Sequence, residues 1–362
     1  MKHNGPAATC AALPPLRSPH DVERVLEFEF VRATENAALN AIQWLGRGDK
    51  EQGDAAACDA IYGVFDLLDV RGEVVIGEGI KDNAPGIFVG ERLGTWREGF
   101  PRFDIALDPI DGTTNLSKGL PNSISVIAAA QVPERAPHVM KHLPSYYSYK
   151  IAYGPALAQA LARDGCPCLL DVPLPEVLRL AARALDKHVR DLVVMTLDRP
   201  RHADIVKAVR ETGAGMRMIS DGDITAAVAP SLPETGIDLY VGAGGSPEAV
   251  LAAAALKCTG GDMQVRMWFH DEAHKAEVAR QVPPEEMTRV FRVNDLVVGD
   301  SALFCATGIS DSALLPGIKV IGHRAETHSI LMRARSRTVR RIHAVHHLDN
   351  KSIPLRSRDG KP

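Results

Sequence analysis

The stretch FDIALDPIDGTTN, residues 103–115, joins an apolar strand to an acidic loop that contains glycine. Residues 103–107 form a short apolar run, which is typical of a buried strand, and Asp108-Pro109 ends it. The preceding β-branched run, EVVI at 73–76, also ends in an acidic loop, GEG at 77–79. Glycines let the backbone approach a ligand closely. Two predicted strands therefore end in loops suited to ligand binding.

In the first half of the chain, the apolar residues before these strands recur with helical periodicity. It predicts helices over residues 21–45 and 55–68, and Asp54 is the expected N-cap of the second. A third apolar strand is predicted over 123–130, and an irregular stretch rich in Pro and Tyr follows over 133–155. An amphipathic segment at 174–185 leads into the second half. These elements indicate an N-terminal domain over residues 21–188.

One unit, a strand followed by a helix, occurs three times from residue 191 onward. The expected strands are 192–197, 216–220 and 237–241, and the expected helices are 203–212, 224–229 and 247–257. This repetition favours an α/β fold with substantial parallel pairing. A charged insertion at 271–286 and strands around 290–298, 302–307 and 327–334 complete a predicted C-terminal domain over 189–345. Residues 346–362 are expected to be a flexible tail.

Composition restricts the class of protein. The chain has 362 residues, 45% of them hydrophobic and 24% charged, with a net charge of −3, so neither disorder, nucleic-acid binding nor membrane association is indicated. The longest apolar runs are far shorter than the ~20 residues that a membrane span needs. Residues 1–20 contain four prolines and no apolar core, so we expect a flexible tail and no secretory signal. Six cysteines without a repeated CxxC pair favour reduced thiols and a cytoplasmic location.

The two acidic loops predict a metal site. Mg²⁺ and Mn²⁺ prefer oxygen ligands, and phosphate hydrolysis commonly uses two such ions, roughly 3.5–4 Å apart. Thr113 can orient a water, and the amides of Gly112 and Thr113 can receive a phosphoryl oxygen. The alternative is structural: Asp108 and Asp111 can shape an Asx-type turn, and Glu78 can be a solvated loop residue.

The octapeptide DPIDGTTN, residues 108–115, resembles the motif of the lithium-sensitive, metal-dependent sugar and inositol phosphatase superfamily. Six further segments narrow the resemblance to class II fructose-1,6-bisphosphatase, over about residues 28–348. They are WLGRGDK at 44–50, VIGEG at 75–79, RPRH at 199–202, SDGD at 220–223, GGSPE at 244–248 and SRTVRRI at 336–342.

This resemblance implies a set of metal ligands and catalytic residues. The ligands fall on Asp54, Glu78, Asp108, Asp111 and Glu248, and the catalytic residues on Thr113, Asp82 and Glu78, with Thr113 positioning the attacking water and Asp82 partnering it. The sequence departs from the family in two places. Asp111 stands where glutamate is usual, and Ile80 and Asn83 stand where acids are usual.

Most candidate substrate-binding residues lie in the second half of the chain. Arg199 and Arg201 precede a predicted helix, where guanidinium groups suit phosphate binding, although a solvated basic turn is the structural alternative. Asp221 and Asp223 can act as helix caps or bind sugar hydroxyls. The GAGG run at 242–245 fails as a dinucleotide loop, because Pro247 takes the place of the third glycine. The substrate-binding residues implied by the resemblance are Asp111, Gly112, Thr113, Tyr147, Arg199, Pro200, Arg201, Asp221, Gly222, Asp223 and Gly245.

The resemblance also implies an activity. It is the hydrolysis of the 1-phosphate of fructose 1,6-bisphosphate in gluconeogenesis or the Calvin cycle, with Mg²⁺ or Mn²⁺ as cofactor and sedoheptulose 1,7-bisphosphate as an additional candidate substrate. The expected fold is a layered α/β sandwich with two sheet-containing domains and an active-site cleft between them, assembled as a homodimer or homotetramer. Two alternatives remain open: an inositol monophosphatase-like enzyme, and a non-catalytic protein that binds sugar phosphates.

Overall fold

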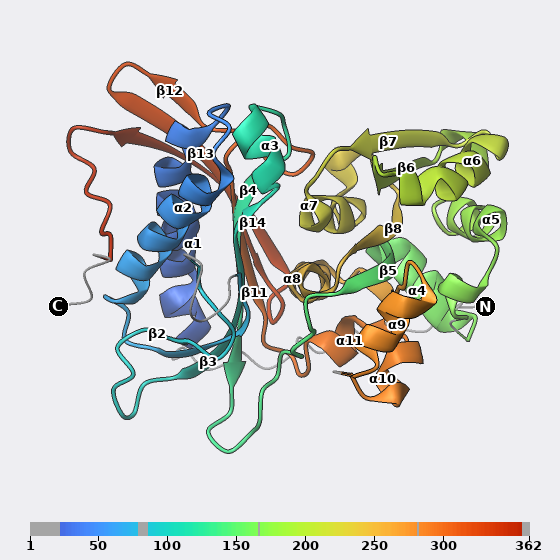
Figure 1. Ribbon diagram of the computed structural model, residues 1–362, viewed down its shortest axis with the longest axis horizontal. Helices are drawn as coiled ribbons and strands as arrows, with labels where there is room; N and C mark the ends of the chain where they lie inside the picture. The colour runs from blue at the N-terminus through green and yellow to red at the C-terminus, as the bar shows by residue number, and fades with distance from the viewer. Residues whose placement is uncertain (1–21, 79–85, 166, 281, 357–362) are drawn as a thin grey trace, which may run out of the picture.

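Helical and sheet layers alternate across the molecule (Figure 1). The computed structural model describes residues 22–78, 86–165, 167–280 and 282–356. Helices α1 (Val22–Ala41) and α2 (Lys50–Phe65) cover one face of a large sheet, and α7 (Asp223–Val228) and α8 (Ser246–Thr259) lie between this sheet and a second one. Helices α4 (Pro155–Arg163), α5 (Leu174–Ala184) and α6 (Ala203–Glu211) cover the outer face of the second sheet. The predicted layered α/β class is confirmed.

The first sheet has eight strands among the described residues, in the order β12-β13-β11-β4-β3-β1-β2, with β14 also paired to β13. Strands β1 and β3 are parallel, and the other pairs are antiparallel. The strands are β1 (Arg71–Ile76), β2 (Arg92–Leu93), β3 (Arg102–Asp111), β4 (Ile124–Val132), β11 (Leu303–Gly308), β12 (Lys319–Ile321), β13 (Arg324–Arg333) and β14 (Thr338–His347).

The second sheet has six strands among the described residues, in the order β10-β9-β5-β8-β6-β7. Only β6 pairs in parallel, with β7 and β8, so the predicted parallel pairing holds for the repeated units alone. The strands are β5 (Tyr147–Tyr153), β6 (Val193–Leu197), β7 (Gly215–Ile219), β8 (Leu239–Gly245), β9 (Asp262–Met267) and β10 (Phe291–Arg292). Short helices complete the fold: α3 (Thr113–Lys118), α9 (Glu272–Val278), α10 (Pro284–Thr288) and α11 (Val293–Leu296).

Helix α8 holds the two sheets together. Its sequence, SPEAVLAAAALKCT, is apolar around most of its circumference, and such a helix is stable only when it is buried on all sides. It packs against β3, β4, β11 and β13 of the first sheet and against β5, β8 and β9 of the second. The run of alanines gives little side-chain bulk, so both sheets can approach the helix closely.

The sheets divide the chain differently from the boundary predicted at residues 188 and 189. Strands β11 to β14 lie in the predicted C-terminal domain but join the first sheet, and β5, α4 and α5 lie in the predicted N-terminal domain but belong to the second sheet. The physical reason is that the apolar strand β11 pairs directly with β4 along six residues. Proximity along the chain therefore does not define the layers.

Three local predictions need correction. Asp49, and not Asp54, is the N-cap of α2, because its carboxylate accepts the amide of Gln52 at 3.1 Å. The stretch predicted as irregular contains β5. The predicted strand 290–298 is strand only at β10 and then turns into helix α11, whose start is fixed by the Asp295 carboxylate accepting the Arg292 amide at 2.9 Å.

Residues 346–356 are held against the first sheet and α2, unlike the flexible tail that was expected. Strand β14 continues to His347, and the Arg356 guanidinium pairs with Asp66 and lies 4.0 Å from the centre of the Tyr62 ring. The predicted N-terminal tail, residues 1–20, lies outside the described residues. No helix of the described part of the chain is long and apolar enough to cross a membrane.

A buried ionic contact joins helix α1 to strand β13. The Glu23 carboxylate at the start of α1 is fully buried, accepts the Ser301 hydroxyl, and accepts Arg333 Nε on β13 at 3.0 Å. Arg333 is only 6% exposed. Removing one partner of such a pair leaves an uncompensated buried charge.

We therefore predict that Glu23→Ala lowers the free energy of unfolding by about 3–5 kcal/mol. As a matched control, Glu29→Ala removes the partner of the exposed Arg32 on the same helix, and this loss should stay below about 1 kcal/mol. Urea unfolding followed by circular dichroism measures both. Equal losses for the two variants would contradict the role assigned to Glu23.

Candidate active site

A cavity of about 510 Å³ opens where the two sheets meet. The first sheet contributes the ends of β1 and β3, and the second contributes the end of β8, the first turn of α8, and the loops that follow β6 and β7. Side chains from both sheets therefore face the same space. This is the inter-domain cleft expected from the sequence.

Four of the five predicted metal ligands line this cavity. Glu78 follows β1, Asp108 and Asp111 lie at the end of β3, and Glu248 lies in the first turn of α8. The fifth, Asp54, projects from α2 beside the cavity, where its carboxylate lies 3.4 Å from the Thr113 hydroxyl. Carboxylates that are up to 194 residues apart in sequence, at 54 and 248, thus converge on one place.

The acidic loop is shaped by the end of β3. The register with β4 shifts between Asp108 and Asp111, and the Asp108 carboxylate accepts the Ile110 amide at 3.0 Å. The Asx-type turn is therefore present, and it coexists with the placement of Asp108 in the cavity. Gly112 follows with φ of 92°, and a Cβ atom there would lie 2.2 Å from the Asn122 carbonyl oxygen, so only glycine fits.

The glycines of GAGG at 242–245 make room for carboxylates. A Cβ atom on Gly244 would lie 2.3 Å from Asp223 Oδ2, and one on Gly245 would lie 2.0 Å from Glu248 Oε2. Both acids therefore rest against bare backbone. The glycine-rich run is therefore explained by the packing of acidic side chains against it, and a nucleotide-binding loop is not needed to explain it.

Electrostatic repulsion links the acidic side chains. Burial and the charge of Glu78 raise the pKa of Asp54 to about 8, and burial and Glu248 raise the pKa of Glu78 to about 7. Burial, with Glu78 and Asp111 as the nearest repelling charges, raises the pKa of Asp108 well above its usual range. For Asp111 the pKa is raised by burial and then by Asp221 and Asp223. Neighbouring positive charges therefore do not neutralise the repulsion between these acids.

The donor set fits a hard divalent cation. It consists of carboxylate oxygens, which Mg²⁺ and Mn²⁺ prefer. Among the described residues, the buried Glu248 Oε2 has no hydrogen-bond partner, although burial of an unpaired carboxylate oxygen is costly. A bound cation would satisfy this oxygen and relieve the repulsion between the acids.

Two arginines, Arg199 and Arg201, line the same cavity as the acids. Arg201 donates from Nε and Nη2 to the Ala243 carbonyl oxygen, at 3.0 and 2.8 Å, and its guanidinium lies 4.9 Å from the centre of the Tyr147 ring. Arg199 Nη2 lies 3.7 Å from Asp221 Oδ1. Arg201 is therefore held rigidly, and its remaining N–H groups are available to an anion.

Lys150 and His202 also contribute to the site, although the sequence predicted no role for either side chain. Lys150 is 1% exposed, pairs with Asp223, and donates to the Gly245 carbonyl oxygen at 2.5 Å. His202 accepts the Ala243 amide on Nε2 at 2.8 Å, and its Nδ1 lies 2.7 Å from the Leu197 carbonyl oxygen. Burial lowers the pKa of His202, so its ring is neutral and connects β6 to β8. The sequence did hold a signal for Lys150, because a lysine within an apolar stretch indicates a buried and paired side chain.

The other predicted residues fall around this core. Tyr147, Arg199, Arg201, Asp221, Asp223 and Gly245 line the cavity, whereas Gly112, Thr113, Pro200 and Gly222 do not line it and lie where short helices begin. Asp223 is committed to Lys150 and to the Tyr240 hydroxyl. Asp82, Ile80 and Asn83 lie outside the described residues.

Carboxylates and guanidinium groups that line one cavity suit a cation-dependent reaction on a phosphate ester, which places the chain among the phosphatases. Sequence comparison makes this specific: residues 24–346 match the family model described as bacterial fructose-1,6-bisphosphatase, glpX-encoded, and the chain belongs to this metal-dependent family. A Haemophilus influenzae protein named fructose-1,6-bisphosphatase class 2 is 39% identical, covering 91% of this chain and 98% of its own length. The Escherichia coli K12 protein named fructose-1,6-bisphosphatase 1 class 2 is 36% identical, with 91% and 97% covered.

The raised pKa values predict how pH affects the metal-free protein. Asp54 and Glu78 bind protons in the folded state up to about pH 8 and 7, whereas in the unfolded chain they release them near pH 4. The folded state therefore holds more protons between these limits, so the stability of the metal-free protein should fall as pH rises from about 5 to 8. Millimolar Mg²⁺ should reduce this fall, because the cation compensates the same charges.

Thermal unfolding in EDTA and in Mg²⁺ across this pH range measures the effect. Asp54→Asn should flatten the profile in EDTA, and Asp164→Asn, which changes an exposed carboxylate at the end of α4, serves as the control. A metal-free protein whose stability rises over this range would contradict the charge repulsion assigned to the cluster.

Proposed function

We propose that this protein hydrolyses the 1-phosphate of fructose 1,6-bisphosphate, giving fructose 6-phosphate and phosphate. One observation carries the proposal: a cluster of carboxylates and a pair of arginines line the same cavity. A cation site and an anion site in one cavity match a substrate with two phosphates. The names of the two relatives, both fructose-1,6-bisphosphatases of class 2, support the same substrate.

Glu78, Asp108, Asp111 and Glu248 would hold Mg²⁺ or Mn²⁺ in this enzyme. The bound cations would polarise the phosphoryl oxygens, activate a water and stabilise the leaving alkoxide. The chain's own contribution is to hold acids from β1, β3 and α8 against one another in spite of their repulsion. The amides of Gly112 and Thr113, where α3 begins, would receive a phosphoryl oxygen.

Thr113 is the residue that orients the attacking water. Its hydroxyl lies 2.9 Å from the Ile110 carbonyl oxygen and 3.4 Å from Asp54 Oδ1, so its donor position is directed into the protein. The lone pairs of the same oxygen remain to accept a hydrogen bond from a water. The Asp54 carboxylate, which accepts the Thr113 hydroxyl, helps to orient it. Glu78 and Asp82 complete the proposed catalytic set.

Arg199 and Arg201 anchor the phosphate that is not cleaved. The contact of Arg201 with Ala243 and its stacking on Tyr147 fix its guanidinium before substrate binds, which lowers the entropic cost of binding. Asp221, Asp223 and Gly245 line the part of the cavity that would bind the sugar, and Gly222, with φ of 100°, shapes the turn between the two acids. Because Lys150 and Tyr240 hold the Asp223 carboxylate, Asp221 is the freer acceptor for a sugar hydroxyl.

The arginine pair favours a bisphosphate over inositol phosphate, which would leave this anchor empty. Sedoheptulose 1,7-bisphosphate, with one more carbon between the same two phosphates, is the additional candidate substrate. We also propose inhibition by Li⁺ through competition at a Mg²⁺ position, a cytoplasmic location, and assembly as a homodimer or homotetramer. The motif at 108–115 supports the first of these.

Replacement of a metal-facing carboxylate should abolish activity without unfolding the protein. Asp108→Asn and Glu248→Gln should each lower kcat by about 100-fold or more, the scale of losing one preorganised electrostatic group. Release of inorganic phosphate in Mg²⁺ or Mn²⁺ measures this, and Asp164→Asn should retain the wild-type rate. Near wild-type turnover in either cavity variant would refute the site, and a wild-type protein that binds the bisphosphate but releases no phosphate would indicate a non-catalytic binding protein.

Loss of the anion anchor should weaken binding more than turnover. Arg201→Ala removes charged hydrogen bonds of about 1.5–3 kcal/mol, so KM for fructose 1,6-bisphosphate should rise about 10- to 100-fold while kcat changes little. Steady-state kinetics with fructose 1,6-bisphosphate, sedoheptulose 1,7-bisphosphate and inositol 1-phosphate measure the preference. The control is Arg190→Ala, at an exposed arginine before β6. If inositol 1-phosphate is the best wild-type substrate, the two-anchor account is wrong.

A further inference from the structure

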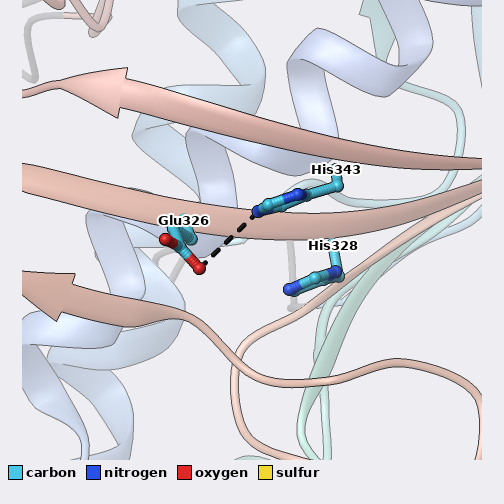
Figure 2. Close-up of side chains that lie close together, drawn as sticks. All are labelled: Glu326, His328 and His343. Carbon is cyan, nitrogen blue, oxygen red and sulfur yellow. Dashed lines mark ion pairs between the residues drawn. The ribbon is translucent and has the colours of Figure 1, made fainter.

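A second group of metal-ligating side chains lies on the neighbouring strands β13 and β14, outside the cavity (Figure 2). In the antiparallel register, His328 on β13 stands directly opposite His343 on β14. Glu326 precedes His328 by two residues, so it projects from the same face of the sheet. The strand pairing therefore brings two imidazoles and one carboxylate together.

The geometry of this group is compact. The two imidazole rings are stacked, with centroids 4.6 Å apart and planes inclined by 3°. His343 Nε2 lies 3.6 Å from Glu326 Oε2, and one ligand atom from each of the three residues lies within 4.8 Å of the others. Ligand atoms around a tetrahedral zinc ion are about 3.4 Å apart, given bonds of about 2.0–2.1 Å. Small side-chain rotations would therefore close the site around one ion.

We propose that Glu326, His328 and His343 form a second divalent-metal site, selective for Zn²⁺ and similar ions. Two neutral imidazoles and one carboxylate are a known three-ligand set for Zn²⁺, which leaves a fourth position for water. Imidazole ligands favour Zn²⁺, Ni²⁺ and Cu²⁺, whereas the all-carboxylate cavity favours Mg²⁺ and Mn²⁺. The two sites thus differ in chemistry, and the protein can bind both kinds of ion at once.

The placement of the site predicts a structural effect. Its ligands come from two strands, and among the described residues β14 pairs with β13 alone. A bound ion would cross-link this outer strand to its neighbour. Lys319 on β12 stands opposite Glu326 and is exposed, so its ammonium group can turn into solvent as the ion binds.

The site is independent of the proposed catalytic function, since none of its three residues lines the cavity between the sheets. Its test can therefore be carried out with excess Mg²⁺ present to occupy the carboxylate cluster. Failure of the zinc site would leave the phosphatase proposal untouched, and the reverse also holds.

Isothermal titration of Zn²⁺ into the full-length protein in excess Mg²⁺ tests the proposal. We expect one equivalent of Zn²⁺ to bind to the wild type, and His343→Ala, His328→Ala and Glu326→Gln each to weaken this binding by at least about tenfold. Glu326→Gln keeps the size of the side chain, so it remains informative if an alanine variant is less stable. The matched control is His274→Ala, because His274 is stacked on His270 at 4.2 Å but belongs to no such three-ligand group among the described residues.

A second readout follows the proposed cross-link. Zn²⁺ should raise the Tm of the wild type and of His274→Ala, and should slow amide hydrogen exchange in β14, but should do neither in His343→Ala. Equal Zn²⁺ affinity and stoichiometry in the wild type and His343→Ala would overturn the proposal. So would a wild type that binds no Zn²⁺ in excess Mg²⁺.

Discussion

Repulsion between carboxylates at the junction of the two sheets is the constraint on which the rest of the structure depends. Asp108 and Asp111 are forced close to Glu78 and Glu248 in surroundings that raise the pKa of each. No folding energy is gained by such an arrangement in the absence of a cation. The surrounding layers must therefore supply the stability that holds these acids in place, and the cluster is poised for a divalent ion.

The layers supply that stability through the burial of apolar side chains and through the pairing of strands that are distant in sequence. Helix α8 presents an apolar surface to both sheets, and its first turn places Glu248 at the edge of the cavity. Strand β3 lies inside the first sheet, between β1 and β4, which makes its acidic end rigid. The late strand β11 completes this sheet beside β4, so residues far apart in sequence stabilise the sheet edge that carries Asp108 and Asp111.

Local sequence patterns and the topology of the sheets differ in how far they could be predicted. Local signals, such as the acidic loops and the Arg199 to Arg201 turn, identified residues that the structure brings to one cavity. The return of β11 to β4 could not be predicted, because strand pairing depends on long-range packing that no local pattern encodes. Strand β5 was missed since Lys150 interrupts its apolar pattern, and this lysine is buried only because Asp223 pairs with it. The predicted cap at Asp54 failed because Asp49 begins the helix earlier.

The central claim is that the carboxylates from both sheets hold a divalent cation that acts on a sugar bisphosphate. Crystals grown with Mn²⁺ and fructose 6-phosphate, measured at the manganese absorption edge, test it most directly. We predict an anomalous difference peak within coordination distance of Asp108 and Glu248, with the sugar phosphate in contact with Arg201. A cavity that holds the sugar phosphate but shows no manganese peak at these carboxylates would contradict the account.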